Sequence, residues 1–349
     1  MNKNKAIRVA SPLVSILLAC LTGSLLILAI GENPLSAFSL IFKGAFGSLA
    51  NFATTTSKMT TLTLTGLSYS FAYRCGLSNI GAEGQMYAGA LCSTLVVLYM
   101  PGPAALVILV AIVAGFIGGG LCGLLIGVLK VAFGANEVIT TVMLNYVMQY
   151  LVLYMVAGPI QDPNSTAPQT MMFDEKYWLP WLNESAKLHC GIILMVLSLV
   201  FYGVFLWKMR AGFGMRVVGQ NNAAAEYAGL NVRTNRLLAM FLAGGFAGLA
   251  GAIEVLGVQH RLLKGVASNY GFDGMAVALL GGTAPVGMFL GGILIGALKS
   301  GGNSLQMFSK IPSSAVDLIR AMVIIFVLVD VVARVAAARN EKRRMMIHE

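Results

Sequence analysis

The sequence predicts an all-α, multi-pass membrane protein of about ten transmembrane helices, because composition and segment length both favour that class. Hydrophobic residues make up 57% of the 349 positions and charged residues only 11%, with a mean hydropathy of +0.79. One water-soluble core could not bury so much apolar surface. A bilayer core about 30 Å thick needs roughly 20 apolar residues per helix, and such stretches recur along nearly the whole chain.

We predict ten spans, two of them shorter than this length, within a single transmembrane domain covering residues 1–349. The predicted spans are 9–30, 55–73, 83–100, 104–129, 136–157, 189–207, 236–258, 272–283, 286–301 and 314–337. The first has the basic start and apolar run of a signal peptide but no small-x-small cleavage site, so we expect an uncleaved helix. Between Leu35 and Phe46, apolar residues recur at helical spacing in a segment too short to cross, which predicts a helix at the outer surface.

The net charge of +10 is distributed between the hydrophobic segments, a pattern that argues against nucleic-acid binding. Basic residues precede the first span, close the chain and surround the loop 209–235, whereas the loop 158–188 is poorer in them and carries acidic residues. The positive-inside rule then predicts a cytoplasmic 209–235 loop, an extracytoplasmic 158–188 loop and two cytoplasmic termini. Trp178 and Trp181 of the outer loop are expected to anchor at lipid headgroups or to meet an external partner.

The sequence contains none of the catalytic, metal-binding or phosphate-binding motifs considered below. Five scattered cysteines show no CxxC spacing, which predicts neither a disulfide framework nor a metal site. There is no HExxH, no GxSxG and no GxxxxGK phosphate loop, so we expect a non-catalytic chain without a cofactor of its own.

The polar stretch Gly76–Gln85 interrupts the hydrophobic pattern between the second and third spans. Irregular backbone at membrane depth is tolerated only where protein or a water-filled cavity satisfies it, and transporters often place substrate groups at broken helices. Asn79, Glu83 and Gln85 are therefore candidates for the substrate pathway. The alternative is a structural re-entrant turn satisfied by neighbouring helices.

A second interruption runs from Asn269 to Pro285, where the apolar stretch is too short to cross comfortably and ends in Gly-Gly-Thr-Ala-Pro. Asp273 in this stretch is expected either to face a cavity or to cap the start of a helix. In the fifth span, Asn136 and Asn145 belong to a polar stripe that either lines the pathway or bonds neighbouring helices.

The segment Gly219–Asn231 lies in the basic loop and predicts a short Ala-rich helix that stops at Gly229. A permease driven by a separate ATPase needs such a protruding element to receive force from its partner. An ordinary loop helix is the alternative.

An internal repeat adds modest support for a transporter, because transporters are often built from duplicated halves. Residues 123–130 (GLLIGVLK) recur as residues 292–299 (GILIGALK), identical at six of eight positions. Small-residue helix packing alone is the alternative source of the match.

Three stretches together resemble the branched-chain amino-acid/ribose-type superfamily of ABC transporter permeases. They are Asn79–Ala90, the cytoplasmic Gly219–Gly229 and Phe272–Gly281, and the resemblance runs in the same order from about Pro12 to Arg334. Within the superfamily, the chain looks most like the nucleoside and simple-sugar permeases. Residues 224–229 match the Ala-Ala-x-x-x-Gly core of the importer coupling motif, although Ala223 stands where a leading Glu is usual.

The resemblance implies a multi-pass importer subunit in a bacterial plasma (inner) membrane that moves nucleosides by alternating access. Its implied partners are a second related permease, a cytoplasmic ABC ATPase that holds ATP and Mg, and an extracytoplasmic substrate-binding lipoprotein. Ribose-like sugars and riboflavin remain alternative substrates, and an ion-coupled secondary transporter using Glu83 or Asp273 remains an alternative class. The residues that the resemblance assigns to ATPase coupling are Asn222, Ala224, Ala225, Glu226, Tyr227 and Gly229.

Overall fold

The structure is a computed structural model that describes Leu18 and residues 21–267, 269–309, 311–312, 314–319, 321–322 and 325–326. After a helix over Leu21–Ala29, the helices are α2 (Pro34–Phe46), α3 (Leu49–Arg74), α4 (Ala82–Tyr99), α5 (Ala104–Phe133), α6 (Glu137–Ala157), α7 (Gly191–Lys208), α8 (Arg210–Gln220), α9 (Asn222–Tyr227), α10 (Val232–Glu254), α11 (Tyr270–Leu280) and α12 (Pro285–Phe308). The loop between α6 and α7 holds the 3₁₀ turn η1 (Glu175–Tyr177) and the strands β1 (Trp181–Asn183) and β2 (Leu188–His189), and a π-helical turn, η2 (Val255–Gln259), continues α10.

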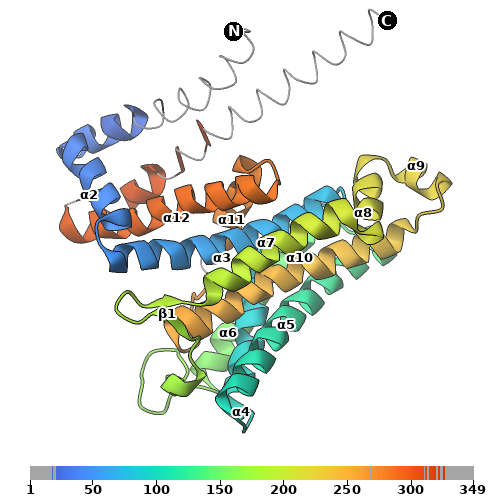
Figure 1. Ribbon diagram of the computed structural model, residues 1–349, viewed down its shortest axis with the longest axis horizontal. Helices are drawn as coiled ribbons and strands as arrows, with labels where there is room; N and C mark the ends of the chain where they lie inside the picture. The colour runs from blue at the N-terminus through green and yellow to red at the C-terminus, as the bar shows by residue number, and fades with distance from the viewer. Residues whose placement is uncertain are drawn as a thin grey trace, which may run out of the picture.

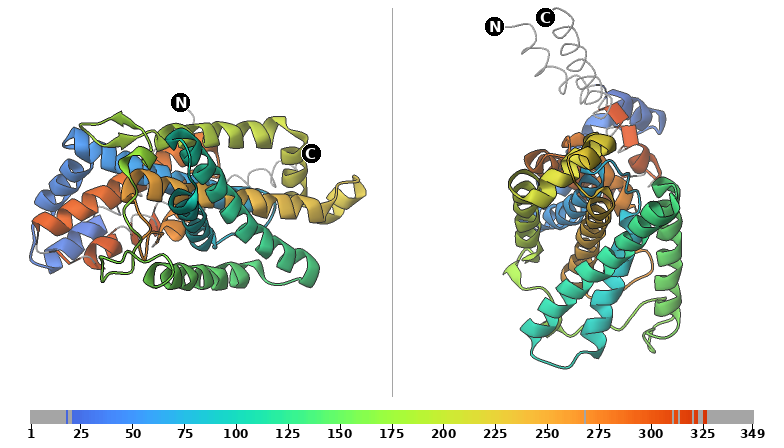
Figure 2. Two further views of the ribbon diagram at one scale, coloured as in Figure 1. Left: turned by 90° about the horizontal axis from the view of Figure 1, so that it is seen from below. Right: turned by 90° about the vertical axis from the view of Figure 1, so that its right-hand side faces the viewer.

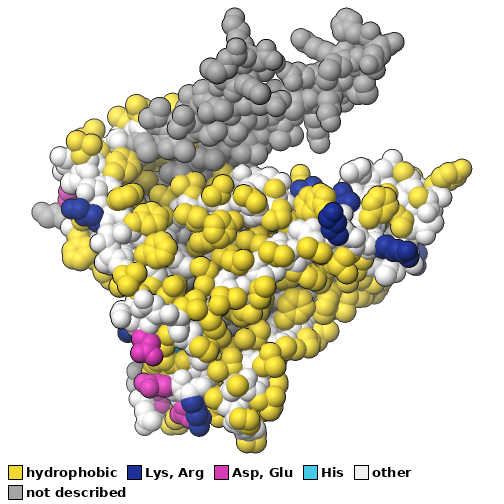
Figure 3. Space-filling model, viewed as in Figure 1, with side chains coloured by type: hydrophobic (Ala, Val, Ile, Leu, Met, Phe, Trp, Pro, Cys, Tyr) yellow, Lys and Arg dark blue, Asp and Glu magenta, His cyan; other side chains and the backbone are white. Residues whose placement is uncertain are grey.

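The helices form an elongated bundle with α10 at its centre (Figures 1 and 2). α10 packs against α3, α4 and α5. In the most apolar 18-residue stretch of Val232–Gln259, 89% of the residues are buried, compared with 17% in the corresponding stretch of α6 at the periphery. α2 lies against α12 on one flank, where Gly301 packs on Ile41. The exposed hydrophobic side chains cover the middle of the bundle, as a lipid-facing surface requires (Figure 3).

The prediction of an all-α membrane protein is confirmed at the level of helix content and apolar spans. Within the described residues, five helices are long and apolar enough to cross a bilayer by length and composition, or six if Leu21–Ala29 and α2, bent by 114°, form one span. Half of the predicted first span (9–30), most of the predicted last span (314–337) and both termini lie outside the described residues. The number ten therefore stays a prediction.

α3 is central although it is rich in threonine and serine. Its hydroxyl groups are buried and mostly bond within the helix, for example Thr60 Oγ1 to the Thr56 carbonyl at 2.8 Å and Thr65 Oγ1 to the Thr61 carbonyl at 3.0 Å. Because these hydroxyls are satisfied locally, α3 can lie in a low-dielectric interior despite its low hydropathy.

Both predicted interruptions are present. The chain leaves the helix from Cys75 to Gly81 between α3 and α4, and α11 is only 11 residues long before the turn at Gly281–Ala284. The starts of α4 and α11 meet, because a Cβ added at Gly271 would lie 2.8 Å from Cβ of Glu83. Two helix N-termini with their first-turn carboxylates therefore converge inside the bundle.

Candidate functional site

A cavity of about 1030 Å³ opens between the start of α3 and the α6–α7 loop. Its lining combines the α6–α7 loop, the π-helical turn η2 and the buried side chains Glu254 and Tyr270. The loop is fixed over η2 by backbone hydrogen bonds, including Leu179 N–H to the Leu256 carbonyl at 3.0 Å and Phe173 N–H to the His260 carbonyl at 2.8 Å. The cavity is concave and has aromatic walls, but most of its lining residues are polar or charged, so it is more polar than an ordinary small-molecule site.

Aromatic side chains line the part of the cavity beside the loop. The imidazole of His260 stacks on Trp178 with ring centroids 3.8 Å apart, and Trp181 approaches the same imidazole edge-on at 5.8 Å. His260 is held there because it ends η2 in a left-handed conformation (φ 53°). Burial lowers the pKa of His260, so its ring is neutral at physiological pH and presents a flat, uncharged face.

His189 lies near His260 of this aromatic group and is also neutral. Its Nδ1 accepts a hydrogen bond from the Gly191 N–H at 3.1 Å, and burial, together with the nearby His260, lowers its pKa to about 4. The side chain is 2% exposed. His189 therefore resists protonation in the folded state.

We expect acidification to destabilise the protein through His189. The unfolded pKa is about 6.5, so this contribution to stability is present above pH 6.5 and is lost as the pH falls towards 4. The melting temperature of the purified protein should fall between pH 7 and pH 4.5, and less steeply in His189→Gln. Equal slopes in the two proteins would contradict this assignment.

Glu254, at the end of α10, is the most buried acidic group that lines the cavity, with 3% of its surface exposed. Thr61 Oγ1 of α3 donates to its Oε2 at 2.9 Å, and Gln259 Nε2 donates to its Oε1 at 3.3 Å. Because α10 changes to a π-helix at the next residue, Gln259 is brought back to face the carboxylate. Lys58, one turn from Thr61 on α3, lines the same cavity.

A second charged group lies beside Tyr270. Lys299 of α12 forms an ion pair of 2.9 Å with Asp273 in the first turn of α11, and its Nζ lies 3.9 Å from the centroid of the Tyr270 ring. Asp273 is thus in a buried ion pair. With Glu83 packed against the start of α11, the site contains acidic and basic groups on α4, α11 and α12.

The predicted residues Asn79 and Gln85 are buried and bond to each other. Asn79 Nδ2 donates to Gln85 Oε1 at 2.8 Å and to Ser68 Oγ at 2.9 Å, and Gln85 Nε2 donates to Asn79 Oδ1 at 3.1 Å. Asn145 accepts from the Gly84 N–H at 2.7 Å. These amides satisfy the interrupted backbone and are absent from the lining of the described cavity, which favours a structural re-entrant turn.

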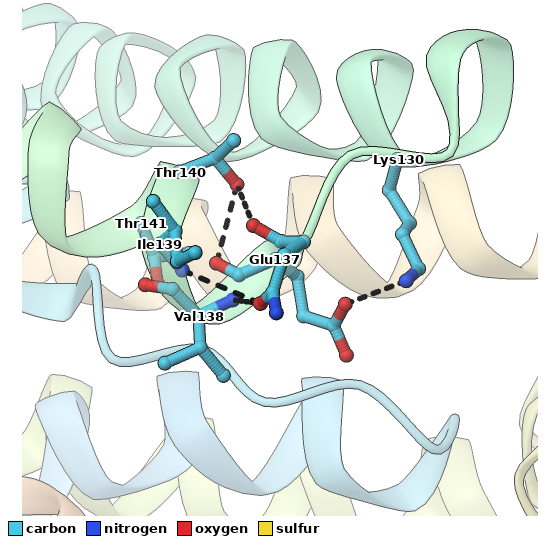
Figure 4. Close-up of polar contacts among 7 residues, drawn as sticks. Lys130, Glu137, Val138, Ile139, Thr140 and Thr141 are labelled. Carbon is cyan, nitrogen blue, oxygen red and sulfur yellow. Dashed lines mark hydrogen bonds and ion pairs between the residues drawn. The ribbon is translucent and has the colours of Figure 1, made fainter.

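Asn136 lies apart from the cavity as the exposed N-cap of α6, accepting from the Val138 N–H at 3.0 Å. The next residue, Glu137, forms an ion pair of 2.7 Å with Lys130 at the end of α5 (Figure 4). Lys130 and Lys299 are the final residues of the two copies of the repeat, and each pairs with a carboxylate at the start of another helix.

Glu254, Lys299 and Lys58 are the site residues that the sequence prediction did not select. The available signal was an ionisable side chain inside an apolar or buried helix, which is expensive and for that reason marks a site. Thr61 had no such signal, because its partner Glu254 is 193 residues away in sequence.

The short Ala-rich helix predicted in the loop 209–235 is present as α9, which protrudes from one end of the bundle (Figures 1 and 2). Gly229 adopts φ 75°, and the N–H groups of Gly229 and Leu230 bond back to the carbonyls of Glu226 and Ala225 at 2.9 Å, a Schellman stop. Ala225 is buried against the bundle, whereas Tyr227 is 97% exposed. α9 is therefore firmly seated and presents an aromatic side chain outward.

An apolar helical bundle with a charged internal cavity and a protruding helix defines a membrane transport protein. Residues 51–328 match the family described as branched-chain amino acid transport system / permease component, and the chain belongs to this family. The predicted resemblance is thereby confirmed, together with the expectation of a non-catalytic transport subunit.

The chain is similar in sequence, over nearly its whole length, to permease proteins of known name. The chain is 35% identical to the guanosine ABC transporter permease protein NupP of Bacillus subtilis, over 95% of this chain and 96% of that one. It is 33% identical to the nucleoside ABC transporter permease protein NupB of Lactococcus lactis (95% and 94%), and 31% identical to the glucose ABC transporter permease protein TsgB13 of Haloferax volcanii (91% and 86%). The first two bacteria each have a second permease relative, at 26% identity. No solved structure matches the chain.

Proposed function

We propose that this chain is the translocating permease subunit of an ATP-binding-cassette importer for nucleosides. The observation that carries the proposal is α9, a short seated helix that ends in a Schellman stop and exposes Tyr227 at one end of the bundle. The names of the two relatives with 33–35% identity support nucleosides as the substrates. The proposal also includes ten membrane spans, two cytoplasmic termini and a position in the plasma membrane of a bacterium.

Charge placement supports that orientation. Lys and Arg gather at the end that carries α8 and α9, whereas acidic residues of the α6–α7 loop lie at the opposite end (Figure 3). By the positive-inside rule, α9 faces the cytosol and the cavity opens to the outside. The outer loop is then the surface on which a substrate-binding lipoprotein docks.

The proposed complex contains a second, related permease, a cytoplasmic ATPase that holds ATP and Mg, and the binding lipoprotein. Two permease relatives in each of two bacteria support a heterodimer. ATP-driven closure of the ATPase would push α9. The neighbouring helix α8 contacts the turn before α4 and could pass this movement into the bundle. A Cβ added at Gly219, at the end of α8, would lie 3.0 Å from the Gly76 N, in the turn that leads to α4 and Glu83.

Tyr227→Ala is expected to uncouple transport from ATP hydrolysis. An almost fully exposed tyrosine on a protruding helix has the character of an interface anchor, so its loss should lower substrate-stimulated ATPase activity of the reconstituted complex by about tenfold or more. Tyr99→Ala is the matched control, because Tyr99 is 67% exposed at the other end of the bundle, where α4 ends. Equal activities of the two variants would count against α9 as the ATPase contact.

The substrate is tested with the whole complex in proteoliposomes. Loaded binding protein should stimulate ATP hydrolysis when it carries a nucleoside, and not when it carries ribose, glucose, riboflavin or a branched-chain amino acid. Glucose is included because one relative with 31% identity is named a glucose permease protein. Stimulation by a sugar alone would reassign the substrate, and uptake that needs an ion gradient and no ATPase would remove the ABC mechanism.

A further inference from the structure

Glu254 has three features that the coupling mechanism leaves unexplained. It is an acidic side chain at the end of the most buried apolar helix, it lines the cavity, and it is followed at once by a π-helical turn. A carboxylate in such a position is costly unless it serves a function, and π-helical turns are frequent at functional sites.

The contacts of Glu254 leave it able to accept more hydrogen bonds. Each carboxylate oxygen has room for about two donors. Thr61 donates to Oε2 at 2.9 Å and Gln259 donates to Oε1 at 3.3 Å, so each oxygen has one protein donor. The two hydrogen bonds fix the orientation of the carboxylate. Its oxygens Oε1 and Oε2 can each accept a further hydrogen bond from a ligand that carries two adjacent donors.

The rest of the cavity fits the remainder of such a ligand. His260, Trp178 and Trp181 form an aromatic group at the other end of η2 from Glu254. Glu254 and His260 lie at opposite ends of the five-residue turn η2, and both line the cavity. A molecule of two linked rings, a sugar and a base, can place its sugar at the carboxylate and stack its flat ring on the aromatic wall.

We propose that Glu254 accepts hydrogen bonds from the vicinal 2′- and 3′-hydroxyls of a ribonucleoside, and that Thr61 and Gln259 position its carboxylate for this contact. The inference rests on the proposed nucleoside function and adds the residue that reads the sugar. The ribose diol is the donor pair common to all ribonucleosides, whereas the donors on the base edges differ from one base to another. A metal cation is disfavoured as the occupant, because no group of three or more His, Cys, Asp or Glu side chains among the described residues is arranged to hold one.

The test compares Glu254→Gln with wild type in the reconstituted complex. The transported ribonucleoside is first identified among guanosine, adenosine and uridine, and its uptake is then compared with that of its 2′,3′-dideoxy analogue at saturating, fully loaded binding protein. Wild type should favour the ribonucleoside by about tenfold or more, the factor expected for about 1.4 kcal/mol. In Glu254→Gln, ribonucleoside uptake should fall by a similar factor while uptake of the dideoxy analogue changes little.

Control variants separate contact from structure. Glu32→Gln makes the same chemical change outside the cavity and should leave both rates as in wild type. If Glu254→Gln does not assemble, Gln259→Ala gives the same test, with a smaller loss confined to the ribonucleoside. Equal losses for both substrates, or none, would overturn the proposal, whereas wild type without nucleoside uptake would overturn the proposed function itself.

Discussion

Lys299→Met is expected to abolish transport and to lower the stability of the folded protein. Lys299 and Asp273 have side chains that are only 14% and 9% exposed, and their ion pair is 2.9 Å long. Removing one member of a buried pair leaves an uncompensated charge, at a typical cost of about 3–5 kcal/mol. In Lys299→Met, the carboxylate of Asp273 also lies near the start of α4, where Glu83 packs against α11.

The double variant Lys299→Met/Asp273→Asn distinguishes charge from side-chain volume. It removes both charges, so its melting temperature should recover most of the loss seen in Lys299→Met, while transport stays impaired because the charged group is gone. Melting is measured on the purified protein and transport in proteoliposomes. A double variant no more stable than the single one would show that the ion pair is not what stabilises α11 against α12.

Local features of this chain could be predicted from the sequence because the residues that determine them are neighbours. α9 and its stop follow from an Ala-rich run with Gly229 behind it, and the broken helix before α4 follows from a cluster of polar and glycine residues. Asn136 is the N-cap of α6, an equally local interaction, although the polar stripe predicted a pathway or interhelical role for it. In each case the deciding interactions lie within a few residues of one another.

The polar contacts in and beside the cavity could not be predicted in the same way, because the partners come from distant parts of the chain. Glu254 meets Thr61 across 193 residues, and Lys299 meets Asp273 across 26. The sequence did identify Asn79 and Gln85 as polar groups at a break. Only the packing shows that the two amides face each other and satisfy the turn. Residue type alone does not determine whether a buried polar group bonds protein or ligand.

The location of the amide cluster also has a mechanical consequence. Gly219 of α8 lies against the turn at Gly76, the same turn holds Asn79, and the turn ends where Glu83 meets Gly271 of α11. A movement of the α8–α9 unit would therefore reach the starts of α4 and α11 through a segment that the buried Asn79–Gln85 amide pair holds in place. A rigid segment transmits displacement better than a flexible loop, which gives the Asn79–Gln85 amide pair a structural purpose.

Gly248→Ala is expected to disrupt the contact between α5 and α10 and to lower stability by about 3 kcal/mol or more. A Cβ at Gly248 would contact the Gly115 carbonyl oxygen and lie 2.9 Å from the Cα of Gly119. These are backbone atoms of a facing helix, so no side chain can rotate away and the helices must separate. The melting temperature and the monodisperse fraction in detergent should both fall.

Gly203→Ala in α7 is the matched control because it makes the same substitution in another apolar helix. Its Cβ would meet only Cγ of Pro285, at 3.5 Å, which is ordinary van der Waals contact. Alanine is intrinsically better than glycine within a helix by about 0.5–1 kcal/mol, so this variant should melt at the wild-type temperature or above. Similar melting temperatures for the two variants would mean that α5 and α10 do not approach as closely in the membrane as Gly115, Gly119 and Gly248 allow.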